Sequence, residues 1–249
     1  MEPFALLGPR HFGDSINRVR YKKVTLSEPR TLMETEFTKE NDMEITAQDV
    51  LVVVDVQNDF CPGGALEIPR GDEVVDEIHG VAERFKHIVL TQDWHPAGHS
   101  SFATSHPGRK AFESIEASYG PQILWPDHCV QGTPGADLHP SLHLPQTELI
   151  LRKGYRREID SYSAFFENDR VTPTGLGGYL RERGLNRAFF CGLAYDFCVG
   201  YSALDARRLG LSAVILKQAS RAINLNGSVR MMEEQFRQAG VIVVDRFAN

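Results

Sequence analysis

Three residue types that can act together in nucleophilic catalysis follow apolar stretches of the chain. Asp55 follows LVVV, Lys153 follows LILR, and Cys198 ends the segment CGLAYDFC. A thiol becomes a strong nucleophile when a base accepts its proton or a positive charge stabilises the thiolate. A carboxyl group whose pKa is raised by burial could accept that proton and return it to a leaving group. We therefore predict that Asp55, Lys153 and Cys198 are catalytic groups.

Each of these residues also has a structural interpretation. An isolated cysteine is commonly a small core residue, Asp55 could cap a turn, and Lys153 could be a solvated surface charge. Cys198 is expected at the N-terminus of a helix, where free amides and the helix dipole favour a thiolate. The agreement of the three residues at separate strand ends is what favours catalysis.

A second group of residues has the spacing of a metal site. In TQDWHPAGHSSF, Asp93 and His95 alternate in extended chain, so their side chains point to the same side. The later segment WPDHC supplies His128, and His99 follows His95 by four residues. Two imidazoles and one carboxylate suit a catalytic Zn²⁺, and Fe²⁺ or Mn²⁺ would also accept them. The alternative is that these histidines are ordinary polar loop residues.

The elements that must position these residues alternate between strands and helices. Short apolar runs predict strands over 52–55, 87–91, 148–151, 188–193, 213–216 and 241–244. Helical spacing predicts helices over 71–85, 174–183, 197–209 and 227–239. This alternation predicts an α/β fold with a doubly wound, mainly parallel sheet and helices on both faces. Ligands bind such sheets beyond the carboxyl ends of the strands, where the candidate residues stand.

Segment 94–146 is rich in His, Pro, Gly and Ser and is too long for an idle connection, so we expect it to build a site. We expect residues 46–249 to form one α/β domain. Residues 1–45 read as a flexible N-terminal extension. An organelle-targeting peptide is disfavoured there by its acidic residues.

Composition limits the possible partners and the setting. The net charge of −6 and the absence of a basic patch argue against a nucleic-acid partner. The apolar runs are too short for a membrane span, and the four cysteines form no CxxC pair. We therefore expect an intracellular, cytoplasmic protein with free thiols. Nothing in the sequence indicates its oligomeric state.

Six motifs together resemble the nicotinamidase family of isochorismatase-like cysteine hydrolases. They occur in the order and spacing of the family and are DVQNDFCPGGAL (55–66), TQDWHPAGHSSFA (91–103), WPDHCVQGTPGA (125–136), RKG (152–154), DSYSAFFEN (160–168) and GLAYDFCV (192–199). The resemblance implies an isochorismatase-like fold. It also implies hydrolysis of nicotinamide to nicotinate and ammonia through a thioester, a reaction that feeds NAD salvage.

Roles for individual residues follow from the same resemblance. It implies a triad of Asp55, Lys153 and Cys198 and a metal held by Asp93, His95 and His128, with the metal binding the pyridine nitrogen of the substrate. His99 matches a position that ligates the metal in some members and lies just outside the ligand set in others, and we expect it outside the ligand set.

The resemblance also implies the substrate pocket and the oxyanion hole. Phe60 and Trp125 would sandwich the pyridine ring. The amides of Ala194 and Cys198 would form the oxyanion hole, with a cis peptide bond just before Ala194. Tyr195 stands where many members have a smaller residue, often Thr, and is expected to shape the pocket.

Two other functions stay open on the sequence. A related cysteine amidohydrolase could act on a ureido or carbamoyl substrate, although such relatives typically lack the Asp-x-His and downstream His set. A dinucleotide-binding or non-catalytic zinc protein would share the fold. No GxGxxG follows the first strand, however, and DVQNDFCPGG puts acids where a pyrophosphate would lie.

Overall fold

Six parallel strands form the central sheet of the protein, whose computed structural model describes residues 43–247. The predicted extension 1–45 falls almost wholly outside the described residues. The order in the sheet is β5-β2-β1-β6-β7-β8. The strands are β1 (Asp49–Val54), β2 (His87–Asp93), β5 (Leu149–Lys153), β6 (Arg187–Leu193), β7 (Ser212–Arg221) and β8 (Ile242–Val244). All six strands predicted from the apolar runs are confirmed, and β7 extends five residues further than its apolar core suggests.

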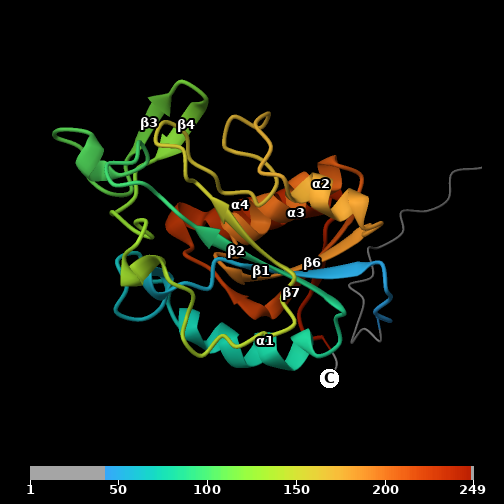
Figure 1. The fold of residues 1–249 in the computed structure, drawn as a ribbon. Coiled ribbons are helices and arrows are strands. Elements are labelled where there is room, and N and C mark those ends of the chain that lie inside the picture. The colour runs from blue at the N-terminus through green and yellow to red at the C-terminus, as the bar shows by residue number, and fades with distance from the viewer. Residues whose placement is uncertain (1–42, 248–249) are drawn as a thin grey trace, which may run out of the picture. The chain divides into compact units, whose positions relative to one another are not determined.

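Helices cover both faces of this sheet (Figure 1). Helix α1 (Val74–Ala82) lies on one face. The other three lie on the opposite face and are α2 (Leu176–Glu182), α3 (Cys198–Arg208) and α4 (Ser228–Ala239). Short 3-10 turns cover Asn58–Phe60, Gly71–Glu73, Ala103–Ser105, Pro134–Ala136 and Leu225–Gly227. The doubly wound fold expected from the sequence is therefore confirmed.

Strand β1 shows why the sheet needs helices on both faces. All six of its residues are buried. Leu51 and Val53 pack in the core on the α1 side, and Val50, Val52 and Val54 pack in the core beneath the other helices. Successive side chains of a strand point to opposite faces, so an unbroken apolar run suits only a strand that is covered on both faces.

The carboxyl ends of β1 and β6 form the point where the strand order reverses. From β1 the chain moves outward to β2 and β5, whereas β6 leads to β7 and β8 on the other side. The two strands approach closely at Gly192, whose φ is +105° and where a Cβ would lie 2.2 Å from the Val54 carbonyl oxygen. Asp55 and Ala194 follow these two strands, so both lie at the switch point.

A hairpin in segment 94–146 was not foreseen from the sequence. Strands β3 (Ser114–Ala117) and β4 (Gly120–Ile123) pair in antiparallel register. The second strand reads GPQI, and its glycine and proline hide the alternation by which strands are recognised. Figure 1 shows the hairpin projecting beyond the sheet.

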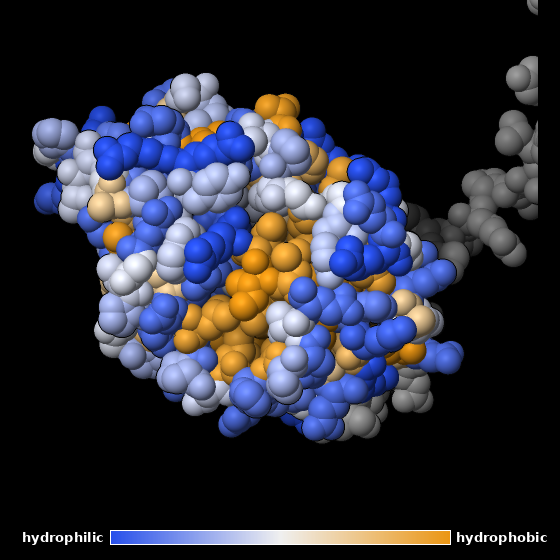
Figure 2. Space-filling model, viewed as in Figure 1, coloured by the Kyte–Doolittle hydropathy of each residue, from blue (hydrophilic) through white to orange (hydrophobic). Residues whose placement is uncertain are grey.

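One apolar region of the surface lies at the edge of the sheet. Ile150 on the edge strand β5 is 51% exposed. Figure 2 shows apolar surface at the centre of the face where β5 lies in Figure 1.

Among the described residues, no helix has the length and apolar character needed to cross a membrane.

An ion pair joins the first residues of β1 and β6. The Arg187 guanidinium donates to both carboxylate oxygens of Asp49, at 2.6 and 2.5 Å. The Thr46 amide also donates to Asp49, at 2.6 Å. Burial favours a raised pKa for Asp49, but the bonds from Arg187 and Thr46 outweigh it and hold the pKa below its usual value.

Replacing Asp49 by alanine should destabilise the protein by about 2 kcal/mol, because it leaves Arg187 partly buried without its partner. The carboxyl titrates at lower pH in the folded chain than in the unfolded chain. Its contribution is therefore complete above about pH 4 and is lost as the pH falls through the depressed folded pKa. Denaturant unfolding at pH 7 and below pH 4 would measure this, with exposed Asp137→Ala as the control. A pH-independent difference between wild type and Asp49→Ala would contradict it.

Candidate active site

The predicted catalytic side chains converge on the ammonium group of Lys153. This group lies 2.8 Å from Asp55 Oδ2 and 3.4 Å from Cys198 Sγ. It also lies 2.8 Å from Asp93 Oδ1 and donates to the Ser161 carbonyl at 2.8 Å. Lys153 is only 1% exposed. The structure thus brings together a thiol, an acid and a lysine from three separate segments of the chain.

Each of these residues is placed by the end of a secondary-structure element. Asp55 directly follows β1 with a φ of 49°, and Thr91 on β2 donates to its Oδ1 at 2.6 Å. Lys153 is the last residue of β5. Cys198 is the first residue of α3, the position expected from the sequence. The parallel strands therefore deliver the three groups to one edge of the sheet.

Burial dominates the electrostatics around the thiol. It raises the pKa of Cys198 well above its usual value, an effect that the Lys153 charge opposes and the Asp55 charge reinforces. Burial also raises the pKa of Asp55, against the opposing charge of Lys153 and with the help of Asp93. Lys153 therefore favours the thiolate expected from the sequence, whereas burial and the Asp55 charge favour the neutral thiol. Side-chain atoms of Asp55 and Cys198 lie within 4.8 Å of each other.

A second cluster beside the first consists of Asp93, His95 and His128. One ligand atom from each of the three lies within 4.8 Å of the others, and all three residues are buried. Asp93 Oδ2 is 3.4 Å from His95 Nε2 and 3.7 Å from His128 Nε2. The structure therefore gathers the three predicted metal ligands at one point.

The hydrogen bonds of the two imidazoles fit a metal site. His95 Nδ1 is 2.9 Å from the Gly154 carbonyl oxygen, and His128 Nδ1 is 2.8 Å from that of Pro126. A carbonyl only accepts, so both Nδ1 atoms carry a proton, and Nε2 is the atom of each ring that can offer a lone pair to a metal. His95 Nε2 is buried without a hydrogen-bond partner. These free lone pairs beside one carboxylate suit a divalent cation.

Gly154 is needed where it stands because the His95 ring lies against it. Its φ is +65°, and a Cβ there would come within 2.5 Å of the His95 ring. Only glycine fits this position while its carbonyl oxygen holds His95.

His99 lies next to this cluster with both of its ring nitrogens engaged. The ring centroid is 4.3 Å from that of His95. Nδ1 accepts from the Ser101 hydroxyl at 2.8 Å, and Nε2 donates to the Arg156 carbonyl at 2.9 Å. With no free lone pair, His99 is poorly suited to bind a metal in this arrangement, which supports its expected place outside the ligand set.

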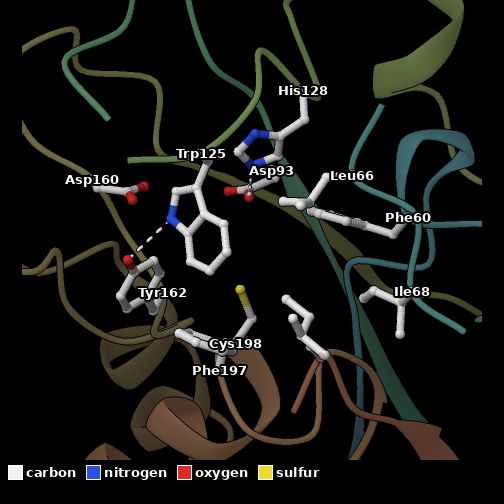
Figure 3. Close-up of a pocket in the computed structure, with 12 residues that line it drawn as sticks. Phe60, Leu66, Ile68, Asp93, Trp125, His128, Asp160, Tyr162, Phe197 and Cys198 are labelled. Atoms are coloured by element: carbon white, nitrogen blue, oxygen red, sulfur yellow. Dashed lines mark hydrogen bonds and ion pairs between the residues drawn. The ribbon is translucent and has the colours of Figure 1, made fainter. Parts of the chain in front are cut away.

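Residues of the two clusters line one common cavity (Figure 3). Phe60 and Trp125, the predicted ring-binding pair, both line it. Cys198 and Ala194 also line it, as do Asp93 and His128. In Figure 3 the Cys198 thiol and the Asp93 and His128 side chains lie on different sides of the same space. An aromatic amide could therefore present its carboxamide to the thiol and its ring to the aromatic residues.

Six further residues of the cavity wall were not assigned by sequence reasoning. They are Leu66, Ile68, Asp160, Tyr162, Phe197 and Ile223. Asp160 and Tyr162 lie in the motif DSYSAFFEN, which was recognised as a whole but without a role for its members. Ile223 follows β7 at a distance from every motif, so only the folded chain reveals it.

Tyr195 is not brought to the cavity, and the expectation that it shapes the substrate pocket is not met. Its hydroxyl donates to Glu233 at 3.1 Å, and its ring packs edge-on against Phe236 of α4. The side chain is 3% exposed within the core beneath α3 and α4. The chain turns between Ala194 and Cys198, so their neighbour Tyr195 points to the opposite side.

The amides predicted for an oxyanion hole lie at the two ends of the turn between β6 and α3. The peptide bond between Leu193 and Ala194 is cis, as the resemblance implies. Within residues 43–247, the amides of Ala194 and Cys198 donate to no other backbone group. The Cys198 amide lies in the first turn of α3, where amides have no partner within the helix, and Ala194 lies in the turn that leads into this helix.

Comparisons with known proteins agree with this geometry. Residues 49–246 match the family model described as the isochorismatase domain. The chain is 50% identical over 191 residues to the nicotinamidase of Acinetobacter baylyi, covering 77% of this chain and 89% of that protein.

Solved structures give the same picture. A nicotinamidase/pyrazinamidase structure from Acinetobacter baumannii superposes with a TM-score of 0.79 at 48% identity, covering 80% of this chain and 96% of that one. A structure of PnC1 from L. infantum in complex with nicotinate has a TM-score of 0.69 at 40% identity, with coverages of 80% of this chain and 92% of that one. A Pyrococcus horikoshii pyrazinamidase in complex with zinc has a TM-score of 0.63 at 33% identity, with coverages of 80% and 99%. The chain therefore belongs to the nicotinamidases of the isochorismatase family.

Proposed function

We propose that this chain hydrolyses nicotinamide to nicotinate and ammonia, and so feeds NAD salvage, with Cys198 as the nucleophile. The observation that carries the proposal is the convergence of Asp55 and Cys198 on the buried Lys153 ammonium, next to a cavity with aromatic walls. The names of the relatives support nicotinamide as the substrate. One similar structure also holds nicotinate, the product of the proposed reaction.

The first half of the proposed reaction forms a thioester. Asp55 takes the thiol proton as Cys198 attacks the carboxamide carbon. The amides of Ala194 and Cys198 stabilise the oxyanion, an effect of about 3 kcal/mol for each donor in other enzymes. When the intermediate collapses, Asp55 returns the proton to the departing nitrogen, and ammonia leaves.

The second half releases nicotinate. Asp55, again unprotonated, removes a proton from a water molecule, which attacks the thioester carbon. The thiolate of Cys198 leaves and is reprotonated by Asp55. Lys153 keeps its charge throughout, because the charges of Asp55 and Asp93 outweigh the effect of burial and raise its pKa well above its usual value.

A divalent metal completes the proposed site. Asp93, His95 and His128 would hold it. We propose Zn²⁺ because a similar structure holds zinc, and Fe²⁺ or Mn²⁺ would also suit these ligands. The metal would supply a Lewis-acid partner for the pyridine nitrogen. Phe60 and Trp125 would bind the two faces of the ring. A cytoplasmic setting is part of the proposal, supported by four free and buried cysteines.

Replacing Cys198 by alanine should reduce ammonia release from nicotinamide at least a thousandfold, because no other group at the cavity can form the thioester. Metal content should be unchanged. A coupled ammonia assay with metal analysis would measure both. Cys191→Ala is the matched control, since Cys191 is buried within β6, with Sγ 4.0 Å from the Val52 carbonyl oxygen. Near wild-type activity of Cys198→Ala would remove this residue from its role.

Replacing His128 by alanine should lower bound metal and raise the KM for nicotinamide, because one of three ligands is lost. Elemental analysis of the purified variant would test this. The control is His106→Ala in the same long segment, since His106 only donates to the Ser100 carbonyl, at 2.8 Å. Unchanged metal stoichiometry in His128→Ala would refute the ligand assignment.

The ammonia assay combined with metal analysis also distinguishes the alternative function from the proposed one. Metal-free protein that is fully active on a carbamoyl amide and inactive on nicotinamide would favour the ureido or carbamoyl amidohydrolase. Wild-type protein that releases ammonia from nicotinamide, with Cys198→Ala inactive, would support the proposed reaction.

A further inference from the structure

The β3–β4 hairpin contributes one buried side chain to the protein interior, that of Gln122. The other residues of β3 and β4 are half-buried or exposed, whereas Gln122 is 1% exposed. A buried amide needs partners for all of its polar groups. Those partners include two residues of the cavity wall.

The amide nitrogen of Gln122 reaches these two residues. Nε2 lies 2.9 Å from Asp160 Oδ2 and 3.0 Å from the Tyr162 hydroxyl. It is also 2.7 Å from the Ile123 carbonyl oxygen. Oε1 accepts from Asn168 Nδ2 at 3.0 Å and from the Tyr119 hydroxyl at 3.2 Å. The carboxylate accepts and the Asn168 amide nitrogen donates, so the orientation of the Gln122 amide is fixed.

Through the Tyr162 hydroxyl, Gln122 is connected to the aromatic wall of the cavity. The indole Nε1 of Trp125 donates to the same Tyr162 hydroxyl at 3.1 Å, the bond drawn in Figure 3. The rings of Trp125 and Tyr162 both pack edge-on against Phe197, with centroids 5.1 and 5.7 Å away. All three rings line the cavity. Gln122 is therefore joined through one hydroxyl to the residue expected to bind the substrate ring.

The segment that carries Asp160 and Tyr162 has anchors of its own. The Asn168 amide donates to the Asp160 carbonyl at 2.8 Å, and Asn168 Oδ1 accepts from the Tyr162 amide at 3.0 Å. These bonds hold the backbone without Gln122. What Gln122 adds is the orientation of two side chains that face the cavity.

We propose that Gln122 is a positioning residue for substrate binding, which fixes the Tyr162–Trp125 wall from outside the cavity. The inference rests on the proposed function, because Gln122 would act from the β3–β4 hairpin on the same substrate cavity. Gln122 lines no part of the cavity itself. Its loss should let the wall move, and so weaken binding of the ring, while the Asp55, Lys153 and Cys198 geometry is kept.

The test compares Gln122→Met with Tyr119→Phe. Methionine keeps the length of the side chain and removes its hydrogen bonds, whereas Tyr119→Phe removes the outer bond to Oε1 and leaves the contacts of Gln122 Nε2 in place. Steady-state kinetics should give a KM for nicotinamide about tenfold higher in Gln122→Met, with kcat within about threefold. Tyr119→Phe should keep both constants within about twofold.

A spectroscopic measurement reports on the wall without turnover. The chain has two tryptophans, so Trp94→Phe leaves Trp125 as the single emitter. In this background Gln122→Met should shift Trp125 emission to longer wavelength and increase its quenching by acrylamide. A wild-type KM together with unchanged emission would overturn the inference, as would a loss of kcat at unchanged KM.

Tyr162→Phe keeps the inference testable if Gln122→Met fails to fold. It retains the ring and removes the hydroxyl that Gln122 and Trp125 share, so KM and Trp125 emission should change in the same direction. Unchanged KM and emission in Tyr162→Phe would overturn the inference. A failure of the proposed function would give a different result. Wild-type protein would then release no ammonia from nicotinamide, whereas Gln122→Met would still change the emission of Trp125.

Discussion

The buried ammonium group of Lys153 is the interaction on which the site depends. An isolated charge in the interior is strongly unfavourable, so Lys153 requires anionic partners. Asp55 and Asp93 supply them, each at 2.8 Å, and the Ser161 carbonyl takes a third position at 2.8 Å. The two carboxylates follow β1 and end β2, and the lysine ends β5. The order of the strands therefore determines that these charges meet.

Asp93 joins the two halves of the site through its two oxygens. Oδ1 contacts Lys153, and Oδ2 faces His95 and His128. Burial favours a raised pKa for Asp93, but opposing interactions, led by the charge of Lys153, hold the pKa well below its usual value. One carboxylate thus stays ionised as a partner for the lysine and as a metal ligand. In the proposed reaction, Asp93 would hold both the catalytic lysine and the metal that would bind the pyridine nitrogen.

Much of the fold and of the chemical groups was predictable from the sequence, because both leave local patterns. Buried parallel strands require unbroken apolar runs such as LVVV, and polar residues directly after them mark the ligand-binding edge. Asp55, Lys153 and Cys198 were found in this way. For Asp93, His95 and His128, the alternation of an extended chain and one more histidine from a long polar segment indicated a metal site, and the family resemblance singled out these three as its ligands.

Features that depend on nonlocal contacts left no such pattern. Gln122 lies in a strand that contains glycine and proline, and its partners Asp160 and Tyr162 are about forty residues away. Ile223 reaches the cavity from an irregular segment after β7. The direction of Tyr195 depends on the turn between β6 and α3, which spacing alone does not determine. Residues 1–42 lie outside the described structure, so the role of the predicted extension stays a prediction.

Acid quenching during turnover, followed by peptide mass spectrometry, tests the central claim most directly. Wild-type protein with nicotinamide should carry a nicotinoyl group on the peptide that contains Cys198, in an amount that falls as substrate is consumed. Turnover without any cysteine adduct, or with an adduct confined to Cys61, Cys129 or Cys191, would contradict a thioester on Cys198.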